Sequence, residues 1–233
     1  MKLLSGIKPK NLLQICNDGS HTIISESFHV TYHSIHGAIT ESNLVFICAG
    51  LDYFQSKNIR EISIFEMGFG TGLNALLSYQ WAEKHKVKIH YHTIEAYPLT
   101  DEIISKLNYP EKLGDRLVFR RIHCSDWNVM VPISEYFVLY KYNSEIESFH
   151  LEGKFDVIFY DAFGPSTQPH LWDIPVLSKM YYALELGGIL VTYCAQGAFK
   201  RNLRIIGFQV ESIPGPPGKR EITRASKMAE DEL

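Results

Sequence analysis

The sequence predicts an α/β protein with a doubly wound, mostly parallel β-sheet. Between residues 61 and 206, short apolar runs typical of buried strands alternate with longer runs that carry apolar residues at helical spacing. The first of these strands leads into three glycines at alternate positions and then into a helix. Such a turn lets a ligand pass close to the backbone, so the pattern indicates a nucleoside site as well as a fold.

The glycine turn distinguishes between two kinds of nucleoside cofactor. A dinucleotide fingerprint would require its third glycine at position 73, where this chain has Leu73. Glu66, just before the glycines, would repel a pyrophosphate but attract the ammonium group of an amino acid. The turn therefore favours S-adenosylmethionine over NAD, although an ordinary strand-to-helix turn can have the same pattern. The expected cofactor-binding residues of the turn are Glu66, Gly68, Gly70, Gly72 and Asn74.

The expected elements follow one another along the chain. Alternation of apolar and polar residues predicts a hairpin over 20–34, and helical spacing predicts a helix over 41–56. Parallel strands are expected at 61–66, 88–95, 117–123, 155–160 and 188–194. Helices are expected at 72–85, 99–107, 173–184 and 197–206. Residues 129–152 show little periodicity, which predicts an insertion before the fourth strand.

The last two strands decide the fold class. Residues 208–213 and 221–225 have strand patterns, and the Pro-Gly-rich segment between them is too short for a crossover helix. The pair should therefore be antiparallel. Five parallel strands followed by such a hairpin predict the Rossmann-like, seven-stranded sheet of class I S-adenosylmethionine-dependent methyltransferases. We expect a small N-terminal extension (1–58), a methyltransferase domain (59–227) and a short tail (228–233).

Size and composition limit the other possibilities. The chain has 233 residues, of which 45% are hydrophobic and 21% charged, as in one soluble globular domain. No apolar run reaches the roughly 18 residues that span a bilayer, and the N-terminus lacks the apolar core of a signal peptide. The cysteines form no C-x-x-C pair and the histidines no H-E-x-x-H motif, so no metal is expected. We expect a cytoplasmic protein with no membrane contact and no obligate protein partner.

Acidic residues follow three of the expected strands. In a parallel sheet, ligands bind beyond the carboxyl ends of the strands. Glu95 ends the second strand, at a distance from the glycine turn typical of a carboxylate that binds ribose hydroxyls. Ser125 and Asp126 follow the third, where Asp126 could accept a hydrogen bond from an adenine amino group. We expect all three residues to contact the cofactor.

Asp161 ends the fourth expected strand, and the reacting groups should lie there. A methyl group on a cofactor that spans the first three strands would point toward this position. Phe163, Pro165, Pro169 and Trp172 would surround it with apolar surface, and Gly164 is expected to contact the substrate with them. The structural alternative is that Asp161 caps the loop while the aromatic residues only pack.

Three motifs together resemble a family of tRNA-modifying enzymes. They are Glu66-Met-Gly-Phe-Gly-Thr-Gly-Leu-Asn74, Asp161-Ala-Phe-Gly-Pro165 with Pro169 and Trp172, and Gly218-Lys219-Arg220-Glu221. With the N-terminal segments 32–34 and 37–42, the resemblance spans roughly residues 28 to 224. The family is that of the tRNA 5-methylaminomethyl-2-thiouridine methyltransferases, found as the stand-alone MnmD protein and as the methyltransferase domain of the bifunctional MnmC protein.

The resemblance implies a reaction and a partner. A methyl group would pass from S-adenosylmethionine to the amine of 5-aminomethyl-(2-thio)uridine at the wobble position 34 of tRNA, with the anticodon stem-loop as partner. Asp161 matches the acid beside the target amine. Because a carboxylate of pKa about 4 is poorly matched to an amine of pKa about 10, we expect Asp161 to bind and orient the ammonium, whose proton leaves through Asp161 or through water. A flavin domain is absent from this sequence, so no FAD is expected.

The same resemblance extends to the substrate-binding surface. Phe163, Pro165 and Trp172 would line a slot for the flipped-out base. Basic residues would bind phosphates of the anticodon loop. The residues expected in that role are Arg201, Lys219 and Arg220.

Three other functions fit parts of the sequence. A methyltransferase that acts on a small-molecule or protein amine keeps every argument about the cofactor. An NAD-dependent oxidoreductase is opposed by Leu73 and Glu66. A non-catalytic RNA-binding module with the same fold is the third alternative.

Overall fold

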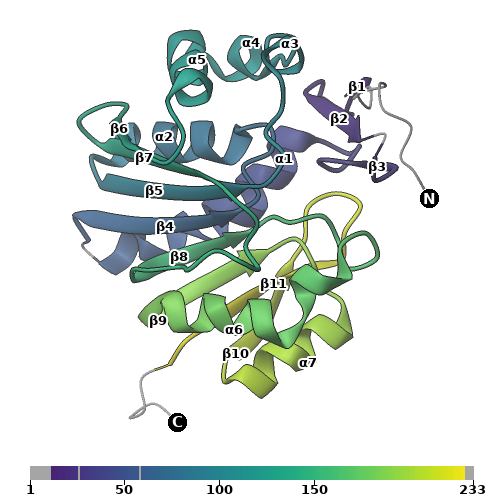
Figure 1. Ribbon diagram of the computed structural model, residues 1–233, viewed down its shortest axis with the longest axis vertical. Helices are drawn as coiled ribbons and strands as arrows, with labels where there is room; N and C mark the ends of the chain where they lie inside the picture. Colours follow the sequence, from purple (N-terminus) through teal and green to yellow (C-terminus); the bar gives the residue numbers. More distant parts are fainter. Residues whose placement is uncertain (1–11, 26, 58, 229–233) are drawn as a thin grey trace.

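The computed structural model describes residues 12–25, 27–57 and 59–228. Its central feature is an eight-stranded sheet (Figure 1). The strands are β4 (Glu61–Met67), β5 (Lys88–Glu95), β6 (Met130–Pro132), β7 (Phe137–Asn143), β8 (Phe155–Tyr160), β9 (Leu184–Thr192), β10 (Gln209–Pro214) and β11 (Glu221–Ser226). They are ordered β10-β11-β9-β8-β4-β5-β7-β6.

The directions of the strands confirm the expected fold class. β4, β5, β7, β8 and β9 are parallel to one another. β11 runs antiparallel to both β9 and β10, as the short connection between the last two strands requires. The sheet has one strand more than expected, because the short β6 pairs antiparallel with β7 at the edge.

Helices cover both faces of this sheet. They are α1 (Ala38–Ser42), α2 (Leu73–His85), α3 (Asp101–Ile104), α4 (Tyr109–Leu113), α5 (Arg116–Cys124), α6 (Ile174–Ala183) and α7 (Gly197–Ile206). The expected helices at 72–85, 173–184 and 197–206 are confirmed. Residues 41–56 are helical but irregular, with a π-helical turn over Asn43–Cys48 and a 3-10 turn over Leu51–Lys57. The helix expected at 99–107 is only the short α3.

One expected strand is wrong. Residues 117–123 lie within helix α5, and the third parallel strand is β7. In α5 the buried residues are Phe119 and Ile122, three positions apart and on one helical face, while Leu117 is 83% exposed. Helical periodicity therefore explains this apolar run better than a strand does.

The same correction applies to residues 129–152, which were expected to be an insertion. This segment contains β6 and β7, and β7 pairs with β5 along its whole length. Phe137, Leu139 and Lys141 alternate toward the interior, and the buried lysine conceals the strand pattern. The Lys141 ammonium donates to the carbonyls of Ile122 (2.9 Å) and His123 (2.8 Å) at the end of α5, and burial lowers its pKa to about 8.

The sheet separates two hydrophobic cores. Successive side chains of a strand point to opposite faces. In β8, Val157 and Phe159 pack with α2 and the N-terminal helices, whereas Ile158 and Tyr160 pack with α6 and α7. Because both faces are buried, the central strands are apolar along most of their length.

The N-terminal extension forms a small sheet of its own. β1 (Leu12–Ile15), β2 (His21–Ser25) and β3 (Val30–Thr31) are antiparallel, and β2 with β3 corresponds to the expected hairpin. The backbone of His21 is bound to the segment around α4: its N–H donates to Asn108 Oδ1 (2.8 Å) and its carbonyl accepts from the Tyr109 hydroxyl (2.7 Å). These bonds hold the extension beside the main sheet (Figure 1).

Candidate active site

A cavity of about 570 Å³ lies at the carboxyl ends of β4, β5, β7 and β8. This position is where the sheet order reverses around β4, and open parallel sheets bind their ligands at such a point. The glycine turn and the Asp161 loop line one part of the cavity. The N-terminal extension lines another part, with Phe28, Tyr32, His33 and Glu41, and Lys219 reaches it from the β10–β11 loop.

The glycine turn is fixed to both neighbouring strands. Gly68 N donates to the carbonyl of Ile94 (3.1 Å), and Asp161 N donates to the carbonyl of Met67 (3.0 Å). Gly68 has a φ of 95°, and a Cβ at this position would lie 3.0 Å from the Asp161 carbonyl oxygen. A side chain at residue 68 would therefore separate the ends of β4 and β8. Gly70 lines the cavity beside Tyr32, and Gly72 lies behind the turn against His123.

Glu95 closes the other side of the turn. Its carboxyl group accepts hydrogen bonds from the backbone N–H groups of Gly70 (3.0 Å) and Tyr97 (2.9 Å). Burial raises the pKa of Glu95, while these amide bonds act in the opposite direction. The residue lines the cavity, so its place agrees with the expected position of a ribose ligand.

Glu66, Asn74 and Asp161 form one hydrogen-bonded group beneath the turn. Asn74 Nδ2 donates to Glu66 Oε1 (3.0 Å) and to Asp161 Oδ2 (2.9 Å). Thr93 Oγ1 donates to the second carboxyl oxygen of Glu66 (2.7 Å). Glu66 is completely buried, and burial raises its pKa to about 8. Glu66 does not line the cavity, so it holds Asn74 in place instead of facing a ligand directly.

Asp161 lines the cavity, beside the glycine turn. Burial raises the pKa of this carboxyl group well above its ordinary value, and the neighbouring carboxylates of Glu66 and Glu41 raise it further. The Asn74 amide and the Lys219 ammonium oppose the shift. The expectation that Asp161 is poorly matched to an amine rested on an ordinary pKa near 4. The shift makes Asp161 better suited to accept a proton from an amine.

Aromatic residues line the cavity next to Asp161. The Phe163 ring lies 5.1 Å from the ring of Phe28 and 5.0 Å, edge to face, from that of Tyr32. Gly164 also lines the cavity, whereas Pro165 does not. Trp172 is only 3% exposed, and its Nε1 donates to the Phe163 carbonyl (2.7 Å). Trp172 therefore supports the loop from behind, and the aromatic surface comes from Phe28 and Tyr32 instead.

Ser125 and Asp126 do not lie where a strand end would place them. They follow helix α5, and neither lines the cavity. Ser144 and Glu145, directly after β7, line it in their place. The polar residues that follow the apolar and aromatic run over 137–142 are the sequence signal for them, although Lys141 conceals the strand alternation of that run.

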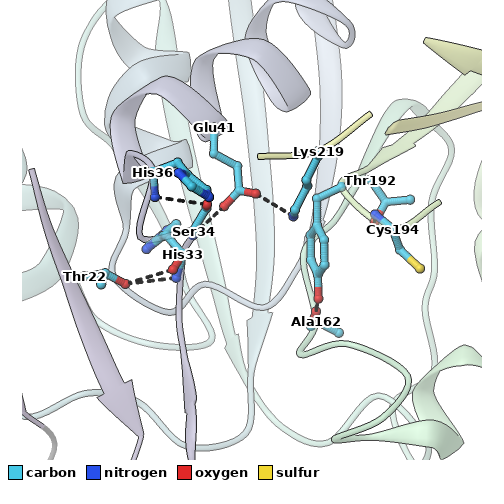
Figure 2. Close-up of polar contacts among 10 residues, drawn as sticks. Thr22, His33, Ser34, His36, Glu41, Ala162, Thr192, Cys194 and Lys219 are labelled. Carbon is cyan, nitrogen blue, oxygen red and sulfur yellow. Dashed lines mark hydrogen bonds and ion pairs between the residues drawn. The ribbon is translucent and has the colours of Figure 1, made fainter. Parts of the chain in front are cut away.

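The three basic residues expected at the substrate divide into two groups. Arg201 and Arg220 are exposed on the surface. Lys219 instead lines the cavity, and its Nζ lies 2.6 Å from Glu41 Oε1 (Figure 2). Glu41, His33 and Tyr193 were not expected in the site. His33 and Glu41 belong to the N-terminal segments that share the family resemblance, which gave them no role in the site, and Tyr193 follows β9.

Among residues 12–25, 27–57 and 59–228, no group of three or more His, Cys, Asp or Glu is placed to hold a metal ion. Within the same residues, every helix is too short or too polar to cross a bilayer.

The known proteins that this chain resembles are methyltransferases and MnmC proteins. Residues 134–228 match a family described as S-adenosyl-L-methionine-dependent methyltransferase. The tRNA 5-methylaminomethyl-2-thiouridine biosynthesis bifunctional protein MnmC of Leptospira interrogans is 31% identical over 218 residues, which cover 86% of this chain and 33% of that protein. MnmC of Aromatoleum aromaticum is 28% identical over 228 residues, which cover 91% of this chain and 34% of that protein. The chain thus spans about a third of the length of these curated relatives.

A solved structure shares the whole fold. The crystal structure of MnmC2 from Aquifex aeolicus superposes with a TM-score of 0.77 and 26% sequence identity, covering 97% of this chain and 75% of that one. The chain therefore has the class I S-adenosylmethionine-dependent methyltransferase fold.

The residues present fit S-adenosylmethionine. The glycine turn leaves the backbone open to the cavity, and Glu95 presents a carboxylate suited to ribose. Asn74 Oδ1 is buried without a hydrogen-bond partner among the described residues, so an acceptor is available for a donor such as an amino-acid ammonium. Gly68, Gly70, Asn74 and Glu95 are the residues that would hold the cofactor.

Replacing Glu66 by Gln should stabilise the protein more at pH 8 than at pH 5. The pKa of Glu66 is about 8 in the folded protein and about 4.3 in an unfolded chain, so its carboxyl group lowers the free energy of unfolding as pH rises between these values. Glutamine cannot ionise and escapes this loss. We expect the free energy of unfolding of Glu66→Gln, relative to wild type, to rise by about 1–3 kcal/mol from pH 5 to pH 8 in urea denaturation.

Glu185→Gln, at an exposed position at the opposite end of the sheet, is the matched control. Its free energy of unfolding should differ from wild type by less than about 0.5 kcal/mol at either pH. A difference for Glu66→Gln that stays constant with pH would contradict the shifted ionisation.

Proposed function

We propose that this chain, a relative of the MnmC proteins with a class I methyltransferase fold, transfers a methyl group from S-adenosylmethionine to an amine on tRNA. The proposed acceptor is 5-aminomethyl-(2-thio)uridine at the wobble position 34, and the product is 5-methylaminomethyl-(2-thio)uridine. The name of the curated relatives supports this substrate. The anticodon stem-loop is the proposed partner.

One observation carries the proposal. Asp161, with its raised pKa, lies in the same cavity as the glycine turn and is joined to that turn through the Asn74 amide. An acid at this place can serve a protonated amine that must lose its proton before it reacts. A group with an ordinary carboxyl pKa would be a much weaker proton acceptor.

The residues of the site would act mainly by positioning. Bound S-adenosylmethionine supplies an electrophilic methyl group. Asp161 Oδ2 accepts from Asn74, which leaves Oδ1 to bind the substrate ammonium and take its proton. Holding the amine in line with the methyl group can account for roughly 7–11 kcal/mol of the barrier.

The aromatic side chains of the cavity would receive the base. A nucleobase that leaves its stack loses stacking energy, and apolar and aromatic surfaces compensate for part of the loss. Phe28, Tyr32 and Phe163 provide such surface beside Asp161. This arrangement favours a base-linked amine over a small free amine.

A direct assay tests the proposed function. The protein is incubated with S-adenosylmethionine and either tRNA that carries 5-aminomethyl-2-thiouridine or the same tRNA without the aminomethyl group. Nucleoside mass spectrometry should find one added methyl group only on the first. Methylation of small-molecule or protein amines, with neither tRNA modified, would favour the alternative methyltransferase.

Replacing Asp161 by Asn should reduce turnover far more than cofactor binding. Asparagine keeps an oxygen acceptor for Asn74 but cannot take up the ammonium proton. We expect kcat to fall by about 100-fold or more, the effect typical of losing a general base. The affinity for S-adenosylmethionine, measured by calorimetry, should change by less than about threefold. Glu185→Gln is the control, and an equal loss of turnover and affinity would remove this role for Asp161.

Replacing the two exposed arginines by Ala should weaken the binding of tRNA and its dependence on salt. Arg201 follows β9 on α7, and Arg220 precedes β11, so both lie near the carboxyl end of the sheet. If each binds one phosphate, the slope of log K against log salt should fall by about 1 for each variant. Arg60→Ala, an exposed site before β4 at the other end, should leave the slope unchanged. An unchanged slope for Arg201→Ala and Arg220→Ala would make them ordinary surface charges.

A further inference from the structure

An ion pair joins the N-terminal extension to the β10–β11 loop inside the cavity. Lys219 Nζ lies 2.6 Å from Glu41 Oε1, and Ser34 N donates to Glu41 Oε2 (2.8 Å) (Figure 2). Glu41 is only 7% exposed, so this carboxylate depends on these two partners. The pair is therefore a fixed part of the cavity lining and not a loose surface contact.

Lys219 is also held from other directions. Its Nζ lies 4.0 Å from the centre of the Tyr193 ring, a distance at which a cation is attracted to the ring face. The Tyr193 hydroxyl donates to the Ala162 carbonyl (2.8 Å), next to Asp161 in the chain. Gly218 has a φ of 87°, and a Cβ there would lie 2.1 Å from the His36 ring. The loop that carries Lys219 thus fits closely against the extension.

Lys219 and Glu41 line the same cavity as Asp161. The ionisable groups around Asp161 come from several elements: Glu66 from β4, Tyr91 from β5, Glu41 from α1, Tyr193 after β9, and Lys219 from the β10–β11 loop. Of these, Lys219 is the cation. Its charge opposes the uptake of a proton by Asp161, while the Glu41 carboxylate favours it.

We propose that Lys219 and Glu41 are positioning residues that set the ionisation of the methyl-transfer site, and that Lys219 does not bind an RNA phosphate. The proposal rests on the function proposed above. A fixed ammonium in the cavity disfavours a second positive charge on the substrate amine. It also favours the ionised form of Asp161, which is the form that can accept a proton. Glu41 holds Lys219 in place and limits this effect.

The two charges should act in opposite directions, which makes the proposal testable. Without the Lys219 charge, both the substrate amine and Asp161 would hold their protons more tightly. Without the Glu41 charge, both would release them more easily. A merely structural ion pair would change stability in both variants without opposite effects on ionisation.

The experiment compares wild type, Lys219→Met, Glu41→Gln and the double variant. For each, kcat/KM is measured from pH 6 to 9 on an anticodon stem-loop that carries 5-aminomethyl-2-thiouridine. The acidic limb of the profile should move to higher pH by about 0.5–1 unit in Lys219→Met and to lower pH in Glu41→Gln. The double variant should lie close to wild type, and Lys219→Arg should restore most of the wild-type profile.

Two measurements without turnover accompany the profiles. Calorimetry should find the affinity for S-adenosylhomocysteine unchanged within about threefold in all variants, because neither residue belongs to the glycine turn. Filter binding of the stem-loop should give the same salt slope for Lys219→Met as for wild type. A slope reduced by about 1 would identify Lys219 as a phosphate ligand and overturn the proposal.

The remaining outcomes are also decisive. If Lys219→Met does not fold, the double variant and Glu41→Gln still differ only in the Lys219 charge, and the limb must lie at higher pH in the double variant. Limbs that move in the same direction, or not at all, in an active protein would overturn this proposal alone. A wild-type protein that does not methylate the stem-loop would overturn the proposed function and this assignment with it.

Discussion

A single side-chain amide, that of Asn74, constrains the whole site. Its two hydrogens bind two carboxyl groups, that of Glu66 beneath the turn and that of Asp161 in the cavity. Asn74 belongs to the first turn of α2, so the same bonds fix where the helix begins and where β4 and β8 end. The amide thus ties the turn to two strand ends, and burial raises the pKa of both acids that it binds.

The concentration of carboxyl groups also determines what the cavity can bind. Glu41, Glu95 and Asp161 line it, and Glu66 lies directly below. Like charges at close range are unfavourable in a region of low dielectric constant. A ligand that brings positive charge relieves this repulsion, which suits the sulfonium and ammonium groups of S-adenosylmethionine and a substrate ammonium. Anionic ligands such as a dinucleotide pyrophosphate would increase it.

Much of the fold and part of the site could be predicted because the relevant signals are local. β4, β5, β8, α2, α6 and α7 each carry their own periodicity, and the strand ends then indicate Glu95 and Asp161. β7 could not be recognised because Lys141 interrupts its apolar alternation. The buried ammonium of this lysine is stabilised by two backbone carbonyls of α5, which the sequence does not reveal. Because of that error, the residues expected to bind the adenine end of the cofactor were placed at Ser125 and Asp126, after a helix and not after a strand. Glu41, His33 and Tyr32 reach the cavity only through tertiary contacts, which no spacing along the chain records.

The contact between Glu41 and Lys219 joins residues 178 positions apart and so bears on how the protein is made. Domains fold as the chain leaves the ribosome, N-terminal parts first. The extension and the glycine turn are synthesised early, whereas Lys219 follows Glu41 by 178 residues. A nascent chain therefore carries the Glu41 carboxylate without its partner until the β10–β11 loop has left the ribosome. The ion pair that completes the cavity lining thus forms only after strands β4 to β10 have been synthesised.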